Sequence, residues 1–212
     1  MIFKFIIFEI YIFLKKQFNK GEEMKKTLFV SLILLAAVIV NKVNAQTAEE
    51  MKAWTEYSTP GKAHEMLAKS DGEWTAEVTM WMDPSGEPMK STATTVNKMI
   101  MGGRYQVSNH TGTMMGMPFE GMNLLGYDNT KKTFISTWID NMGTGMMIME
   151  GPWDEATKSA TLRGKQTDPL TGKDMDVKEI FQIVDDNTQK FEMYMSKDGN
   201  EMKVMEIPYK RK

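Results

Sequence analysis

The stretch GEWTAEVTMWMDPSG, residues 72–86, decides the fold, because apolar side chains begin there to alternate with more polar ones. Trp74, Ala76 and Val78 are separated from one another by single residues, and the alternation continues to position 82. A period of two predicts a β-strand with one buried face. The tetrapeptide DPSG at 83–86 predicts the turn that follows this strand.

The same rhythm of strand and turn continues to the end of the chain. Turn signals such as GG at 102–103, DNTK at 128–131 and DGN at 198–200 separate the apolar segments. Connections of this length make neighbouring strands antiparallel, and closure of the sheet removes its exposed edges. We therefore predict an all-β fold, an antiparallel up-and-down barrel of about ten strands, with an open two-sheet sandwich as the alternative. The predicted strands cover residues 73–82, 89–100, 104–115, 119–127, 132–140, 144–153, 158–166, 173–184, 189–197 and 201–210.

A short helical segment precedes the strands, so that residues 46–70 form a lead-in and residues 71–212 form the barrel domain. The polar stretch 47–57 is compatible with one helix. Thr59 and Pro60 have the residue types of an N-cap and of a first helical residue, which predicts a second helix of about two to three turns after them.

Residues 24–45 have the three parts of a secretory signal peptide. Met24 is followed by two lysines, residues 27–40 are apolar, and the tripeptide VNA at 43–45 is a small-residue cleavage site. The apolar run is too short for a stable membrane anchor. We therefore expect cleavage after Ala45 and a secreted or periplasmic protein that is soluble after cleavage.

Residues 1–23 precede this signal peptide, and we interpret them as a misannotated upstream extension. The signal peptide already begins with its own Met24, and the codons of Gly21, Glu22 and Glu23 can resemble a ribosome-binding site. The alternative is a genuine, extended n-region.

The composition of the remaining chain excludes several kinds of protein. Residues 1–45 contain seven of the 26 basic and three of the 28 acidic residues, so residues 46–212 carry a formal net charge of −6. This acidic balance argues against nucleic acid and anionic membranes as partners. The chain has no cysteine, hence no disulfide framework and no lipidation site, and its core alone must hold the domain together.

Four segments of the chain carry a family resemblance: PGKAHEMLAKSDGEW (60–74), MGMPFEG (115–121), GYDNTKKTFISTWIDNMGTG (126–145) and DPLTGK (168–173). Together they resemble the DUF1579 family of exported, functionally uncharacterised proteins. The resemblance implies a lipocalin-like β-barrel, in agreement with the short helix that precedes Gly72 and Trp74. It implies no catalytic residues.

The sequence offers few metal ligands. With two histidines, His64 and His110, and no cysteine, a tetrahedral zinc site of His and Cys ligands is excluded. One histidine can hold haem in a small barrel, but polar residues flank His110 where haem requires an apolar pocket. His64 lies in the predicted helix, where we expect it to cap or pack that helix. We predict no metal and no cofactor.

Methionine is unusually frequent, with 22 residues of which all but Met1 and Met24 lie after the signal peptide. Thioethers are ligands for Cu(I), whereas methionine also fills irregular cores and apolar pockets. Adjacent pairs such as Met114–Met115 and Met146–Met147 point to opposite faces of a strand. We therefore interpret these methionines as barrel wall and apolar lumen rather than as copper ligands.

Two carboxyl groups are candidates for a site inside the barrel. Asp140 shares a strand face with Trp138, which predicts an indole in the lumen and a carboxylate at its mouth. Glu179 alternates in phase with apolar residues, so its carboxyl requires a partner or a proton, and Arg104 is the expected partner. Such a pair is either structural or anchors the head group of a ligand. The candidate ligand-binding residues are Arg104, Trp138, Asp140, Glu179 and, on the first strand, Trp74.

These features favour a non-enzymatic function, since the chain has no G-x-S-x-G motif and no cysteine nucleophile. We predict an exported protein that binds a small apolar or amphipathic ligand in a lumen lined by methionine and aromatic residues. One alternative is a structural or interaction protein of the envelope, with a filled lumen and an exposed apolar patch near Trp54 or Trp81. The other is a hydrolase or isomerase that uses carboxyl groups of the lumen.

Overall fold

The computed structural model describes residues 12, 15, 28–32, 47–83, 86–197 and 199–212. The chain divides into two units, residues 1–53 and 54–212. The predicted upstream extension and signal peptide lie outside the described residues, except that residues 12, 15 and 28–32 are helical. No helix in these described ranges is both long and apolar enough to cross a membrane.

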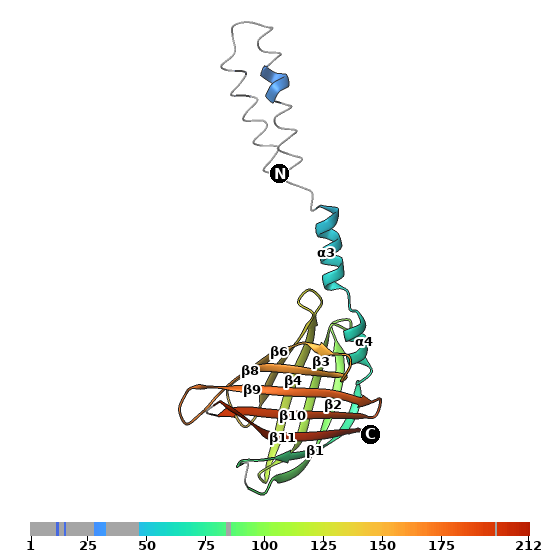
Figure 1. Ribbon diagram of the computed structural model, residues 1–212. Helices are drawn as coiled ribbons and strands as arrows, with labels where there is room; N and C mark the ends of the chain where they lie inside the picture. Colours follow the sequence, from blue (N-terminus) through green and yellow to red (C-terminus); the bar gives the residue numbers. More distant parts are fainter. Residues whose placement is uncertain (1–11, 13–14, 16–27, 33–46, 84–85, 198) are drawn as a thin grey trace. The chain divides into compact units, whose positions relative to one another are not determined.

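One antiparallel sheet, closed into a barrel, makes up most of residues 54–212 (Figure 1). The first and last strands pair with each other, and a pairing between β6 and β8 completes the wall of ten strands. The two-residue strand β7 pairs only with β8. The strands are β1 (Gly72–Met80), β2 (Met89–Ile100), β3 (Tyr105–Met114), β4 (Met117–Asp128), β5 (Thr133–Asp140), β6 (Met147–Gly151), β7 (Trp153–Asp154), β8 (Ser159–Thr167), β9 (Asp174–Asp185), β10 (Thr188–Lys197) and β11 (Asn200–Arg211).

The predicted up-and-down barrel is confirmed, and the ends of nine predicted strands agree with the observed ones to within two residues. The exception is the predicted strand 144–153, which is divided into β6 and β7. Pro152 separates them because it has no N–H to donate to a ladder. Gly151 allows the close approach of β8, since a Cβ atom there would lie 1.8 Å from the carbonyl oxygen of Thr161.

Helices α3 (Ala48–Ser58) and α4 (Lys62–Ala68) directly precede the barrel strands. The prediction that Thr59 caps the second helix is wrong, because its hydroxyl donates to the carbonyl of Thr55 at 2.6 Å instead. The N-cap of α4 is Gly61, whose N–H donates to Nδ1 of His64 at 3.1 Å. His64 thus caps the helix, as the sequence predicted, and its ring lies edge-on to Tyr127.

Helix α4 closes one end of the barrel. The carbonyl groups at a helix C-terminus lack partners inside the helix, and here strand side chains supply them. Gln106 donates to the carbonyl of Leu67 at 2.8 Å, and Trp74 donates to that of Ser70, also at 2.8 Å. Asn97 donates to the same Ser70 oxygen at 3.1 Å. Three strands are therefore tied to the end of α4.

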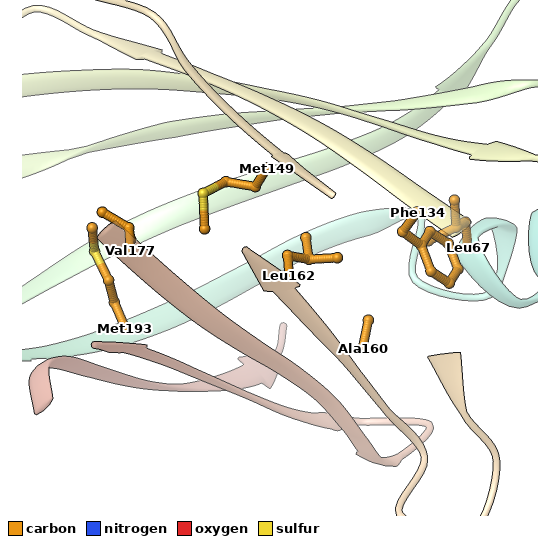
Figure 2. Packing of buried hydrophobic residues seen from close by; sticks show 7 residues of the cluster. All are labelled: Leu67, Phe134, Met149, Ala160, Leu162, Val177 and Met193. Atoms are coloured by element: carbon orange, nitrogen blue, oxygen red, sulfur yellow. The ribbon is translucent and has the colours of Figure 1, made fainter. Parts of the chain in front are cut away.

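The interior is packed where α4 closes the barrel and less packed toward the opposite end, which we call the mouth. Leu67 is 1% exposed and lies beside Phe134 (Figure 2). A void beside Leu67 and Phe134 in this packed region measures about 20 Å³, which is too small for an organic ligand. Inward-facing side chains nearer the mouth are half-buried, and they include Val78, Ala93, Asn123, Trp138, Met147 and Met205.

We expect Leu67→Ala to destabilise the barrel by about 2–5 kcal/mol, because it leaves a cavity at the closed end. Chemical denaturation, followed by far-UV circular dichroism, gives this difference in unfolding free energy. Leu170→Ala is the matched control, since Leu170 is 93% exposed and its truncation should change stability by less than about 0.5 kcal/mol. Equal effects of the two substitutions would contradict a packed closed end.

Candidate functional site

The lumen has one polar and one apolar wall. The apolar wall is formed by β6 and β8 to β11, with buried side chains of Met149, Leu162, Val177, Met193 and Ile207. The polar wall is formed by β2 to β5. Its inward-facing polar residues are Thr95, Asn97, Gln106, Ser108, His110, Asn123 and Ser136.

Most polar groups of the polar wall bind one another. The hydroxyl of Thr95 lies 2.9 Å from Nδ1 of His110, and Asn123 donates to the hydroxyl of Ser136 at 2.5 Å. Burial lowers the pKa of His110 to about 4, so its imidazole is neutral at pH 7. This wall can therefore form hydrogen bonds but carries no charge from His110.

Trp138 lies in the lumen near the mouth, held between two rings. Its ring stacks on Phe119 with centroids 6.4 Å apart and meets His110 edge-on at 5.1 Å. Gly121, the partner of Asp140 on β4, leaves room for this ring, because a Cβ atom there would lie 2.6 Å from the indole. The indole thus forms a fixed, half-buried apolar surface.

Asp140 orients Trp138 and closes the turn after β5. Its Oδ2 accepts a hydrogen bond from the indole N–H of Trp138 at 2.7 Å, and its Oδ1 accepts one from the backbone N–H of Met142 at 2.9 Å. Each carboxylate oxygen therefore already has a donor. Asp140 positions the indole rather than presenting a free carboxylate to a ligand.

Glu179 presents the free carboxyl group instead. It is 7% exposed, on the apolar wall between Leu162 and Met193, and no described residue forms a hydrogen bond or an ion pair with it. Burial raises the pKa of Glu179 to about 7. No described side-chain oxygen or nitrogen is fully buried without a partner, so this carboxyl keeps some access to the lumen.

Tyr209 of β11 lies within electrostatic range of Glu179. The buried environment and the charge of Glu179 both raise the pKa of the phenol. Tyr209 was not among the predicted site residues, although it alternates in phase with Met205 and Ile207 and so shares the inward face. Strand alternation could have found it.

The expected pairing of Arg104 with Glu179 is not formed. Arg104 is exposed at the closed end, where its guanidinium donates to the carbonyl of Met101 at 3.1 Å. Glu179 lies in the middle of β9, away from that turn. Alternation correctly assigned the face of Glu179 but could not give its height along the barrel.

Trp74 has no surface left for a ligand. It is fully buried, its indole N–H is bonded to Ser70, and the guanidinium of Arg211 lies 4.3 Å from its ring. The structure therefore brings Trp138, Asp140 and His110 together near the mouth, places Glu179 on the apolar wall, and leaves Trp74 and Arg104 at the closed end.

A further hollow of about 390 Å³ lies over β3, β4 and β5. Alternation with the inward-facing His110 places its lining residues Asn109, Met122 and Ile139 on the outer surface of the wall. The lining also includes His110, Gly121 and Asp140, which belong to the inward face. Nowhere in the described ranges do three His, Asp or Glu residues gather in a way that could hold a metal ion.

Comparison with known proteins gives a family and a fold. The family model described as "Protein of unknown function (DUF1579)" matches residues 59–211. No curated protein matches the sequence. The crystal structure of Rv2717c from M. tuberculosis is similar, with a TM-score of 0.55 and 14% identity over 73% of this chain and 99% of that one. A likeness at this identity shows the shared fold alone.

The low pKa of His110 predicts a stability that falls in acid. The folded pKa of about 4 lies below the ordinary histidine value of 6.5. The stability that the neutral His110 contributes is therefore fully present above pH 6.5 and is lost as the pH falls toward 4. Between pH 7 and pH 4 we expect the unfolding free energy of the wild type to fall by about 3 kcal/mol more than that of His110→Gln. Urea unfolding of both proteins at pH 7 and pH 4 measures this difference. An equal loss of unfolding free energy in both proteins would contradict a buried, neutral His110.

Glu179 predicts the opposite dependence. Its folded pKa of about 7 lies above the ordinary value of 4.5. The stability that the protonated Glu179 contributes is therefore fully present below pH 4.5 and is lost as the pH rises through 7. The unfolding free energy of Glu179→Gln, measured relative to that of the wild type, should increase by about 3 kcal/mol between pH 4 and pH 8. Glu150→Gln, on the exposed face of β6, controls for the loss of a carboxyl. A difference for Glu179→Gln that is independent of pH would refute the raised pKa.

Proposed function

The chain belongs to the DUF1579 family of proteins of unknown function, and we propose that it is an exported protein that binds a small amphipathic ligand in its barrel. The site is the part of the lumen between Trp138 and Glu179, on the mouth side of the packed core. Lumens of eight- to ten-stranded barrels hold single small ligands.

The observation that carries this proposal is the unpartnered carboxyl of Glu179. A buried carboxyl without a hydrogen-bond partner destabilises a fold, and the described residues supply it with none. A ligand that donates a hydrogen bond to Glu179 would offset this cost. The ligand class is therefore one with a hydroxyl or amino group.

The other residues of the site indicate the chemical character of the rest of the ligand, apart from its donor group. Met193 and Val177 give an apolar wall on one side, and the ring of Trp138 gives a rigid apolar surface near the mouth. Most hydrogen-bonding groups of the polar wall already bind one another or the end of α4, so they add little attraction for a strongly polar body. An apolar body with one donor group fits best.

Catalysis by paired carboxyl groups fits less well. A carboxyl pair acts as acid and base when the two groups perturb each other. Burial is the only cause of the raised pKa of Glu179, and no neighbouring charge contributes to it. Asp140 is engaged with Trp138 and Met142.

The outer wall supports a second candidate, an interaction protein of the envelope. Exposed apolar side chains lie there on β2, β4 and β6, and they are Val96, Met122, Leu124 and Ile148. Met122 also lines the hollow over β3 to β5, and exposed apolar patches are typical of protein contacts. It does not exclude a ligand in the lumen.

Native mass spectrometry of the exported protein, purified without detergent, tests the ligand proposal. We expect the wild type to carry an adduct of constant mass, and Glu179→Leu to lose it because the acceptor for the ligand's donor group is gone. Glu150→Gln should keep it. The proposal fails if the wild type carries no adduct and also does not bind a neutral, solvatochromic fluorophore more tightly than Glu179→Leu does.

A further inference from the structure

The inward faces of three neighbouring strands bring three methionines into one row across the sheet. Met80 of β1 pairs directly with Met205 of β11, which pairs directly with Met193 of β10. Met89 of β2 extends the row toward the mouth as the partner of Met80. Glu179 of β9 extends it at the other end as the partner of Met193.

These residues are not the methionines that cluster in the sequence. Met114–Met115 and Met146–Met147 are adjacent along the chain, so half of each pair points away from the lumen. The members of the row are far apart along the chain, and only the pairing of β1 with β11 and of β11 with β10 brings them together. Cross-strand partners share a face, so their side chains point the same way.

Core filling accounts for only part of the row. Met193 is 8% exposed and belongs to the buried core with Leu162, and Met205 packs against that core. Met80 is a member of neither core cluster. Met80 and Met205 are only half-buried, and Met89 is exposed at the start of β2. The row therefore extends from the exposed Met89 to the buried Met193.

The separation of the three strands allows the three methionine sulfur atoms to bind one ion. Neighbouring strands lie about 4.8 Å apart, so the outer members of three paired residues are about 10 Å apart at the backbone. Methionine is unbranched and has three rotatable bonds, so two such side chains can turn toward the one between them. A thioether is a soft, uncharged ligand that selects Cu(I) among biological metal ions.

The carboxyl of Glu179 adds the charge that thioethers lack. Three neutral sulfurs leave a monovalent cation uncompensated, and a carboxylate beside Met193 neutralises it. The apolar residues around the row exclude water, which favours such a contact. The chain has no cysteine, so no thiolate competes for the ion.

We propose that Met80, Met193 and Met205 form a binding site for Cu(I) inside the barrel, with Glu179 as the neighbouring negative charge. This site needs no organic ligand, so it does not rest on the proposed function. The two proposals fail separately, because the metal site depends on the sulfur atoms and the ligand site depends on the acceptor of Glu179.

Anaerobic titration with Cu(I) against a coloured, competing Cu(I) chelator tests the site. We expect the wild type to bind one equivalent and Met80→Leu/Met193→Leu/Met205→Leu to bind about 100-fold more weakly, because leucine has no donor atom. Leucine conserves the volume, and such exchanges cost less than about 1.5 kcal/mol each. Circular dichroism of the triple variant checks that it folds.

The matched control is Met101→Leu/Met122→Leu/Met146→Leu, which changes three exposed methionines outside the row. It should bind Cu(I) as the wild type does. X-ray absorption at the copper edge should show sulfur neighbours in the wild type and in this control. The proposal is overturned if the wild type competes no better than the triple variant of the row, if the control loses binding equally, or if the bound copper has only oxygen and nitrogen neighbours.

Discussion

The hydrogen bonds between the end of α4 and the barrel strands are the constraint on which the interior depends. A helix C-terminus placed in a barrel opening would bury carbonyl groups without partners. Gln106, Trp74 and Asn97 remove that cost by donating to Leu67 and Ser70. The barrel is therefore closed at one end by a helix whose polar end is satisfied and whose Leu67 fills the core.

Closure at one end makes the lumen asymmetric along its axis. Aromatic and aliphatic side chains pack around Leu67 and Phe134 (Figure 2), and no comparable element covers the mouth among the described residues. Trp138 is fixed in this less packed part by Asp140, and Glu179 lies on the mainly apolar wall between Leu162 and Met193. A rigid apolar surface and an unpartnered carboxyl thus both face the lumen.

Much of this fold follows from the alternation of residues, because a period of two in the sequence fixes which face a side chain occupies. It correctly assigned Trp138 and Glu179 to the inward face. Alternation does not give the register between strands, and a barrel's tilt shifts paired residues along the axis. For this reason the contact of Arg104 with Glu179 was predicted wrongly, and the row of Met80, Met205 and Met193 was not foreseen. The split between β6 and β7 depends on Pro152, whose missing N–H outweighs an otherwise strand-like pattern.

The central claim is that a ligand occupies the space between Trp138 and Glu179. A crystal structure of the exported protein, purified from its producing cells without detergent, tests it most directly. The claim predicts electron density in the lumen for a molecule with an apolar body against Trp138 and a donor group within hydrogen-bond distance of the Glu179 carboxyl. A lumen in which side chains alone fill that space, with the carboxyl of Glu179 bonded to another residue of the chain, would contradict it.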